Sequence, residues 1–398
     1  MAISEKVKQL MGGSSWVRKM FETAARLKEQ YGEDNIFDFT LGNPVEEPPQ
    51  GFKEALKEFG LNPIRGMHRY MPNSGYPETR QFVAQQLAQE TGMPFTEHHI
   101  LMTVGAGGGL NVALKAILDQ GDEVIVPSPY FVEYGFYIDN HGGVMRLVDT
   151  ADDFSLDLEA IEKAITEKTK IVLVNSPNNP TGAVYAADSL SALGELLRAK
   201  SKGRRTPIYL LADEAYKAII YENCPFPNVF EFYEPAISVV SYSKSLGIPG
   251  ERIGYAAINP LYSGAEELMG AMIFLNRTLG YINAPALMQR LLPLSGANHD
   301  GPREYQRKRD ILYEALNEYG YSLIKPQGAF YMFPQTPIKD DLAFVMDLQQ
   351  TFHILTVPGR GFGKEGYFRI AYSVEMDVIE RSLPGFEQAA RKYGLRKG

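Results

Sequence analysis

Short apolar runs alternate with amphipathic, helix-like segments from about Glu54 to Asp213. The runs ILMTV, EVIVP, IVLVN and PIYLLAD lack polar alternation, which is typical of strands that are buried on both faces. Between them lie segments such as GLNVALKAILDQ and LDLEAIEKAI, whose apolar positions have helical spacing. This rhythm predicts an α/β fold, with a mainly parallel sheet flanked by helices. A further predicted strand, AISVVSY, ends shortly before Lys244.

The two ends of the chain show a different pattern. An amphipathic segment covers Trp16 to Tyr31, and long helical stretches after Asn283 are mixed with short strands around 329–333 and 367–371. A chain of 398 residues also exceeds the size at which one core usually stops growing, about 250–300 residues. We therefore expect a large domain over 51–289 and a smaller α+β domain formed by 1–50 together with 290–398.

Charge and composition exclude several kinds of protein. The net charge of -8 and the lack of a dense Lys/Arg stripe argue against nucleic acid as a partner. The N-terminal MAISEKVKQL does not resemble a signal peptide, and no apolar run is long enough to span a membrane. The single Cys224 permits neither an intramolecular disulfide nor a Cys-rich metal site. We expect a cytoplasmic protein without a metal centre.

Residues with useful chemistry follow several predicted strands. In open α/β sheets, ligands bind beyond the carboxyl ends of the strands, so these residues are predicted to meet at one rim. They are the glycines of 105–109, Phe131, Asn179, Asp213 with Tyr216, and Ser241 with Lys244.

Phosphate binding and nucleophilic chemistry are both possible at this rim. The glycines can bring backbone amides close to an anion at a helix start, although tight packing explains them equally well. They match neither the nucleotide-binding P-loop nor the dinucleotide fingerprint, which disfavours an NAD-type oxidoreductase. Lys244 could act as a neutral amine rather than as a solvated loop lysine. Arg252 could pair with a phosphate and would lower the pKa of a neighbouring amine.

The remaining rim residues suit a pyridine ring. Asp213 could hold a protonated pyridine nitrogen, although a helix N-cap is a comparable explanation. Asn179 and Tyr216 could hydrogen-bond a ring oxygen. For Asn179, turn chemistry in a Pro/Gly loop is the competing interpretation.

With these residues assembled, the chain resembles the class I/II aminotransferases of fold type I, the aspartate-aminotransferase-like pyridoxal-phosphate enzymes. The resemblance covers nearly the whole chain. Its motifs follow the family order: LGNP at 41–44, Tyr70 before GYPETR, the glycines at 105–109, PYFVEY, NNPTG, DEAY, SYSKSLGIPGERIGY and FRIA at 368–371.

The resemblance implies a role for each matching residue. Lys244 would bind pyridoxal 5′-phosphate covalently and later shuttle a proton, while Asp213 would pair with the pyridine nitrogen. The other cofactor contacts would come from Ala106, Gly107, Phe131, Asn179, Tyr216, Ser241 and Arg252, and from a Tyr70 that reaches over from a second subunit of a homodimer. The substrate α-carboxylate would be held by Arg369, helped by Gly42 and Asn179.

Two positions depart from common family patterns. Phe131 stands where many relatives carry Tyr or Trp, which keeps ring stacking and loses a polar group. Gly107 stands where one aspartate-specific subgroup has a Lys that reads a side-chain carboxylate, so the amino donor is left open. Possible readers of a substrate side chain are Arg18, Arg65, Arg69 and Arg277.

The leading hypothesis is an aminotransferase that moves an amino group between an L-amino acid and a 2-oxo acid. A β-lyase-like or aminocyclopropane-carboxylate-synthase-like enzyme on the same fold is the first alternative. A regulatory or binding module is the second, and it is disfavoured because no basic helix-turn-helix extension is visible and because Lys244 is present.

Overall fold

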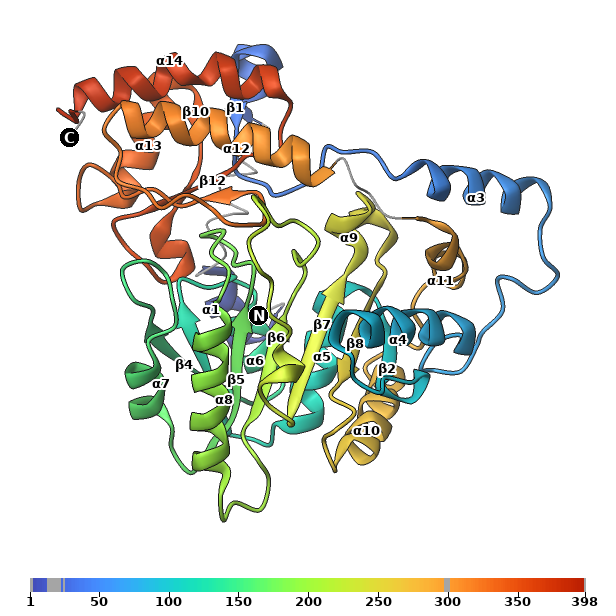
Figure 1. Cartoon of the computed structure of the whole chain (residues 1–398). Coiled ribbons are helices and arrows are strands. Elements are labelled where there is room, and N and C mark those ends of the chain that lie inside the picture. Colours follow the sequence, from blue (N-terminus) through green and yellow to red (C-terminus); the bar gives the residue numbers. More distant parts are fainter. Residues whose placement is uncertain (1–2, 13–22, 24–25, 297–300, 397–398) are drawn as a thin grey trace.

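A seven-stranded sheet forms the centre of the molecule (Figure 1). The computed structural model describes residues 3–12, 23, 26–296 and 301–396. The strand order of the large sheet is β2-β8-β7-β6-β5-β3-β4. Its strands are β2 (Ile100–Thr103), β3 (Glu123–Ser128), β4 (Val144–Asp149), β5 (Thr169–Asn175), β6 (Tyr209–Asp213), β7 (Ala236–Ser241) and β8 (Gly254–Ile258).

Most strands of this sheet run in the same direction. The pairs β4–β3, β3–β5, β5–β6 and β6–β7 are parallel, whereas β8 is antiparallel to both of its neighbours, β7 and β2. The expected mainly parallel sheet is therefore confirmed, with one reversed strand that the sequence pattern did not reveal.

Helices cover both faces of the sheet. In β5, Ile171 and Leu173 belong to an apolar cluster with α5, α6 and α10, whereas Val172 and Val174 belong to another with α4, α8 and α11. This division of alternate residues explains why the strand contains no polar alternation. The helices of this part of the chain are α3 (Gln50–Leu61), α4 (Pro77–Thr91), α5 (Gly105–Ile117), α6 (Tyr134–Asn140), α7 (Leu158–Ala164), α8 (Ala187–Ser201), α9 (Tyr242–Ser245), α10 (Ala265–Thr278) and α11 (Ala286–Leu291).

A second layer of smaller elements lies beyond the carboxyl ends of the parallel strands (Figure 1). It contains the antiparallel sheet β11-β12-β9 and the parallel pair β1-β10. A third apolar cluster joins these strands to three long helices. The elements are β1 (Phe37–Asp38), β9 (Tyr331–Met332), β10 (Ile354–Leu355), β11 (Val357–Pro358), β12 (Phe368–Ala371), α12 (Gly301–Glu318), α13 (Asp341–Phe352) and α14 (Met376–Lys392).

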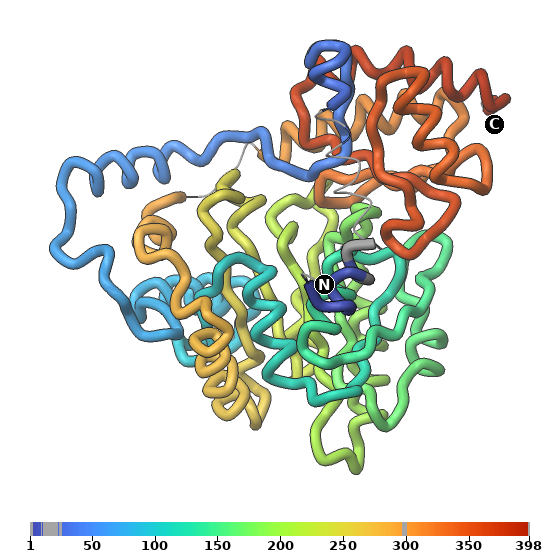
Figure 2. Tube along the Cα trace, turned by 180° about the vertical axis from the view of Figure 1, so that it is seen from behind, coloured from blue at the N-terminus to red at the C-terminus, as the bar shows by residue number. Residues whose placement is uncertain are grey.

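The N-terminal part of the chain contributes to this second layer. Phe37 pairs with Ile354 and Asp38 with Leu355, so residues 37 and 38 lie beside the C-terminal elements (Figure 2). Of the expected amphipathic segment at 16–31, residues 26–31 are helical, and most of the rest lies outside the described residues. Helix α1 (Glu5–Gly12) precedes it.

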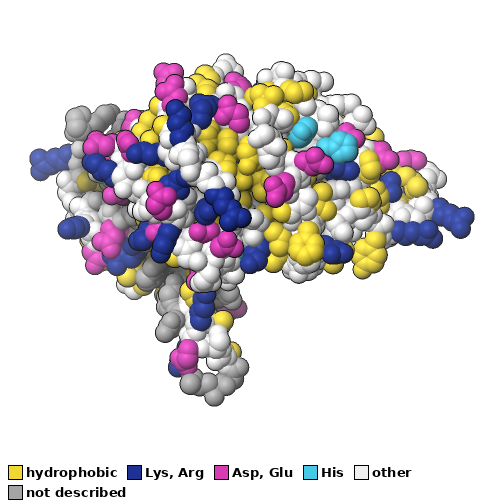
Figure 3. Space-filling model, turned by 90° about the horizontal axis from the view of Figure 1, so that it is seen from below, with side chains coloured by type: hydrophobic (Ala, Val, Ile, Leu, Met, Phe, Trp, Pro, Cys, Tyr) yellow, Lys and Arg dark blue, Asp and Glu magenta, His cyan; other side chains and the backbone are white. Residues whose placement is uncertain are grey.

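Helix α3 and the loop that follows it extend away from the large sheet (Figure 1). On the face shown in Figure 3, Lys and Arg side chains are interspersed with Asp and Glu. Among the helices of the described residues, none combines the length and apolar character that crossing a bilayer requires.

Candidate active site

A cavity of about 480 Å³ lies at the carboxyl ends of the parallel strands, below the second layer of elements. It brings together all of the predicted site residues except Tyr70. Its lining includes Gly42, Ala106, Gly107, Phe131, Asn179, Asp213, Tyr216, Ser241, Lys244, Arg252 and Arg369. Tyr70 lies on the loop between α3 and α4, is 86% exposed, and does not line the cavity of its own chain.

Lys244 is held in the short helix α9 directly after β7. The side chain of Ser241 caps this helix by accepting a hydrogen bond from the N–H of Ser243 at 3.1 Å. The Nζ of Lys244 donates to the carbonyl oxygen of Gly42 at 2.8 Å. Burial lowers the pKa of Lys244 to about 8, and the nearby Arg252 and Arg369 add to the shift. A neutral, nucleophilic amine is therefore accessible near neutral pH.

Asp213 closes β6 with a carboxylate that is only 5% exposed. The hydroxyl of Tyr134 donates to Oδ2 at 2.7 Å, and the N–H of Ala215 donates to Oδ1 at 3.2 Å. Burial raises the pKa of Asp213 to about 6, against the lowering effect of these two hydrogen bonds. Among the described residues, no cation forms an ion pair with Asp213. Its carboxylate can therefore accept a cationic group that enters the cavity.

The glycines of 105–109 form the first turn of α5. The sequence suggested a turn leading into a helix, but the helix begins at Gly105 itself. Gly105 has a φ of +73°, and a Cβ at this position would lie 3.0 Å from Nη2 of Arg252. The glycine thus lets the guanidinium of Arg252 approach the helix start, where the amides of Ala106 and Gly107 have no partner within the helix. This arrangement can bind an anion.

Arg369 on β12 is 3% exposed and spans the two layers of the molecule. Its Nη1 donates to Oδ1 of Asn179 at 3.0 Å, and its Nη2 donates to the carbonyl oxygen of Thr40 at 2.6 Å. Its Nε is buried without a hydrogen-bond partner among the described residues. The guanidinium is also 4.7 Å from the ring centroid of Tyr331. Arg369 is therefore positioned to bind a carboxylate, which would satisfy the remaining donor.

A pair of tyrosines joins the two layers at the cavity. The hydroxyl oxygens of Tyr216 and Tyr331 are 2.6 Å apart. A Cβ at Gly42 would lie 2.0 Å from the hydroxyl oxygen of Tyr331, so only glycine fits there without a shift. Tyr331 thus fixes the position of the loop whose carbonyl oxygen accepts the hydrogen bond from Lys244.

Sequence reasoning missed several residues that line this cavity or contact its lining. Asn175 ends β5, donates to the carbonyl oxygen of Asp213 at 2.9 Å, and accepts from the N–H of Asn179 at 2.8 Å. The position of Asn175 at the end of a predicted strand could have identified it as a site residue. Tyr134 lies in the PYFVEY motif, but the motif does not show that Tyr134 contacts Asp213. Tyr331 lies on a strand of the smaller sheet, and no sequence pattern indicated that it reaches the cavity.

The candidate readers of a substrate side chain do not reach the cavity of their own chain. Arg65, Arg69 and Arg277 are exposed and absent from its lining. Arg18 lies outside the described residues.

Comparison with known proteins identifies the family. The model of the family described as "Aminotransferase class I and II" matches residues 34–383. This chain belongs to that family. The predicted resemblance, fold class and enzyme class are confirmed, and the protein is a transaminase. The family assignment does not favour the lyase alternative.

Individual relatives extend over nearly the whole chain. The aspartate/prephenate aminotransferase of Thermus thermophilus is 33% identical over 88% of this chain and 90% of its own length. Aromatic-amino-acid aminotransferase 2 of Thermococcus litoralis is 30% identical over 99% of this chain and 100% of its own length. The crystal structure of an aminotransferase from Eubacterium rectale superposes with a TM-score of 0.94 at 36% identity and covers 99% of both chains.

Proposed function

We propose that this transaminase binds pyridoxal 5′-phosphate covalently through Lys244 and transfers the amino group of an L-amino acid to a 2-oxo acid. The family is generally dependent on this cofactor. The observation that carries the proposal is one cavity lined by both an amine with a lowered pKa, Lys244, and a buried carboxylate without a cationic partner among the described residues, Asp213.

The residues of the cavity fit the three parts of the cofactor. Asp213 would pair with the pyridine nitrogen, which supplies the cation that the carboxylate lacks. The amides of Ala106 and Gly107, together with Ser241 and Arg252, would hold the phosphate. The ring of Phe131 would cover one face of the pyridine. When bound, pyridoxal phosphate supplies an electron sink for the charge that develops at the substrate α-carbon.

The chain itself supplies binding groups and proton transfer. Arg369 would bind the substrate α-carboxylate through its free donor, with Gly42 and Asn179 beside it. The amine of Lys244, once released by the incoming amino group, would take the proton from the substrate α-carbon as a general base and pass it, as a general acid, to the cofactor carbon that carried the aldehyde. Asn179 and Tyr216 would orient the cofactor by hydrogen bonds to its ring oxygen.

Borohydride trapping tests the covalent link. The purified chain, loaded with pyridoxal phosphate and reduced, should carry the added mass on the peptide that contains Lys244, and the unreduced protein should be yellow. A colourless protein that takes up no cofactor, or a label on another lysine, would contradict the proposal. Release of pyruvate or ammonia from a donor without any 2-oxo acid would instead indicate lyase chemistry, because a transaminase needs the acceptor to turn over.

We also propose that the enzyme is a homodimer in which Tyr70 of the partner subunit contacts the phosphate. Support comes from the 86% exposure of this side chain and from its absence from the cavity lining of its own chain. Within each chain, residues 51–289 would form the cofactor-binding domain, and 1–50 with 290–398 the smaller domain. A cytoplasmic location stays a prediction.

A further inference from the structure

We propose that Glu133 and Tyr137 form a subsite for the substrate side chain that excludes a second carboxylate and favours cationic or hydrogen-bond-donating side chains. This inference deepens the proposed function and rests on it. It concerns the part of the cavity that contacts the substrate side chain, which is the part that distinguishes one amino acid from another.

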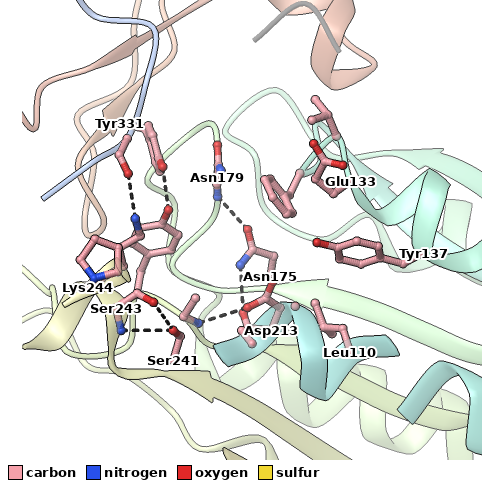
Figure 4. Close-up of a pocket in the computed structure, with 18 of the residues that line it drawn as sticks. Leu110, Glu133, Tyr137, Asn175, Asn179, Asp213, Ser241, Ser243, Lys244 and Tyr331 are labelled. Carbon is pink, nitrogen blue, oxygen red and sulfur yellow. Dashed lines mark hydrogen bonds between the residues drawn. The ribbon is translucent and has the colours of Figure 1, made fainter. Parts of the chain in front are cut away.

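The charged residues of the cavity point to Glu133. Among the described residues, the charged side chains in the lining are Asp213, Lys244, Arg252, Arg369 and Glu133. In the proposed function, Asp213 would pair with the ring nitrogen and Lys244 would bind the carbonyl carbon. Arg252 would bind the phosphate, and Arg369 would bind the α-carboxylate. Glu133 has no such role. Figure 4 shows it close to Tyr137, on the side of the cavity opposite Lys244.

Glu133 brings a carboxylate to this side without a neutralising partner among the described residues. Glu133 directly precedes α6 and lies three residues after the end of the PSPY segment at 127–130. Burial raises the pKa of Glu133, and no opposing effect of a cation accompanies that shift. A second carboxylate placed beside it would meet like charge in a half-buried setting, which is destabilising.

Tyr137 adds to the same corner a hydroxyl that can accept as well as donate a hydrogen bond. Its hydroxyl oxygen lies 3.2 Å from the position that a Cβ of Gly107 would take, so it occupies the space over that glycine. Burial and the neighbouring Glu133 are the two largest causes that raise the pKa of Tyr137 to about 12, so the hydroxyl keeps its proton. The phenol oxygen can accept a hydrogen bond from an ammonium or an amide N–H, and Glu133 repels a second carboxylate; with no lysine at position 107, the corner therefore favours the first two groups.

Equilibrium binding of three five-carbon carboxylates to the cofactor-loaded enzyme tests this subsite. Isothermal titration calorimetry would compare glutarate, pentanoate and 5-aminopentanoate, which place a negative, neutral or positive end in the corner. We expect glutarate to bind more weakly than the other two by about tenfold, a ratio that a modest charge–charge interaction produces. Glu133→Gln should strengthen glutarate binding by about the same ratio and weaken 5-aminopentanoate binding.

Two further variants test whether the effect on binding is specific to the residues of this subsite. Tyr137→Phe removes only the hydroxyl, which can accept a hydrogen bond from an ammonium, and should weaken 5-aminopentanoate binding without strengthening glutarate binding. Glu159→Gln removes an exposed carboxylate on α7 and should change none of the three affinities. Tighter binding of glutarate than of pentanoate by the unmodified enzyme, or no response to Glu133→Gln, would overturn the subsite. Failure of the proposed function has a different signature: the chain would then take up no cofactor.

Discussion

Arg369 and Asn179 are 190 positions apart in the chain, yet Nη1 of the arginine donates to Oδ1 of the asparagine at 3.0 Å. The contact links β12 of the second layer to the loop after β5 of the large sheet. Both side chains are almost fully buried, so the hydrogen bond is protected from water and fixes the orientation of the guanidinium. The position of the proposed α-carboxylate clamp thus depends on the packing of the two layers against each other.

Arg369→Lys should therefore impair substrate binding while keeping the charge. Lysine cannot reproduce the forked geometry, and it leaves Asn179 and the carbonyl of Thr40 with poorer partners. We expect kcat/KM to fall by roughly 10- to 100-fold, the equivalent of about 1.4–2.8 kcal/mol. Steady-state kinetics would measure it, with the exposed Arg391→Lys as the control. Unchanged kcat/KM would show that Arg369 does not contact the substrate.

Lys244→Ala should abolish turnover without unfolding the chain. The substitution removes both the proposed attachment point and the group that moves the proton at the α-carbon. The absorbance band of the covalently bound cofactor should be absent, while the circular dichroism spectrum should match that of the unmodified enzyme. Substitution of the exposed Lys163 by Ala provides the control. Normal rates in Lys244→Ala would rule out the assigned role.

Tyr134→Phe should change the acidity of Asp213. The tyrosine hydroxyl donates to Asp213 at 2.7 Å and lowers a pKa that burial has raised to about 6. Loss of this hydrogen bond raises the pKa further, so more of the carboxyl is protonated at a given pH. We expect the acidic limb of the kcat/KM profile to move to higher pH, with a larger loss at pH 6 than at pH 8. Tyr209→Phe, which removes a contact with Tyr262 far from Asp213, should leave that limb in place.

The pH dependence of cofactor attachment should reflect the pKa of Lys244. Because the neutral amine is the reactive form, the attachment rate to the cofactor-free chain should rise with pH through about 8, well below the ordinary value of 10.5. Arg252→Met removes one of the cations that lower this pKa and should move the midpoint to higher pH. Stopped-flow absorbance would follow the reaction, with Arg277→Met as the control. A midpoint that is the same in both variants would show that Arg252 has no influence on the amine.

Hybrid dimers test the proposed sharing of Tyr70. A chain with Tyr70→Ala and a chain with Lys244→Ala should each have little activity alone. In a mixed dimer, the site with an intact Lys244 would receive an intact Tyr70 from the other chain, so co-expression should restore part of the activity. If Tyr70 served its own chain, co-expression would restore nothing beyond the activity of Tyr70→Ala itself.

The central sheet could be predicted because strands that are buried on both faces consist of uninterrupted apolar residues. Runs such as Ile171 to Val174 are apolar throughout, and turn residues mark where they end. The reversed direction of β8 could not be predicted. Its residues, Gly254 to Ile258, are as apolar as those of the parallel strands, and strand direction depends on the connection rather than on the side chains.

Some residues of the candidate site could be predicted from the sequence, and others could not. Residues at strand ends, such as Asp213 and Asn179, were predictable because the topology of a parallel sheet brings strand ends together. Tyr331 was not, since its place beside Tyr216 depends on how the second layer packs on the first. The contact of Tyr134 with Asp213 also required coordinates, because helical spacing alone does not show which way a tyrosine points.

The parallel pairing of β1 with β10 has a consequence for synthesis of the protein. Residues 37 and 38 leave the ribosome early but must wait for residues 354 and 355 before they can pair. All strands of the large sheet lie before residue 259 and can assemble in the meantime. The nascent chain can thus build the Lys244 and Asp213 end of the rim during translation, whereas the Thr40–Arg369 contact forms only near termination.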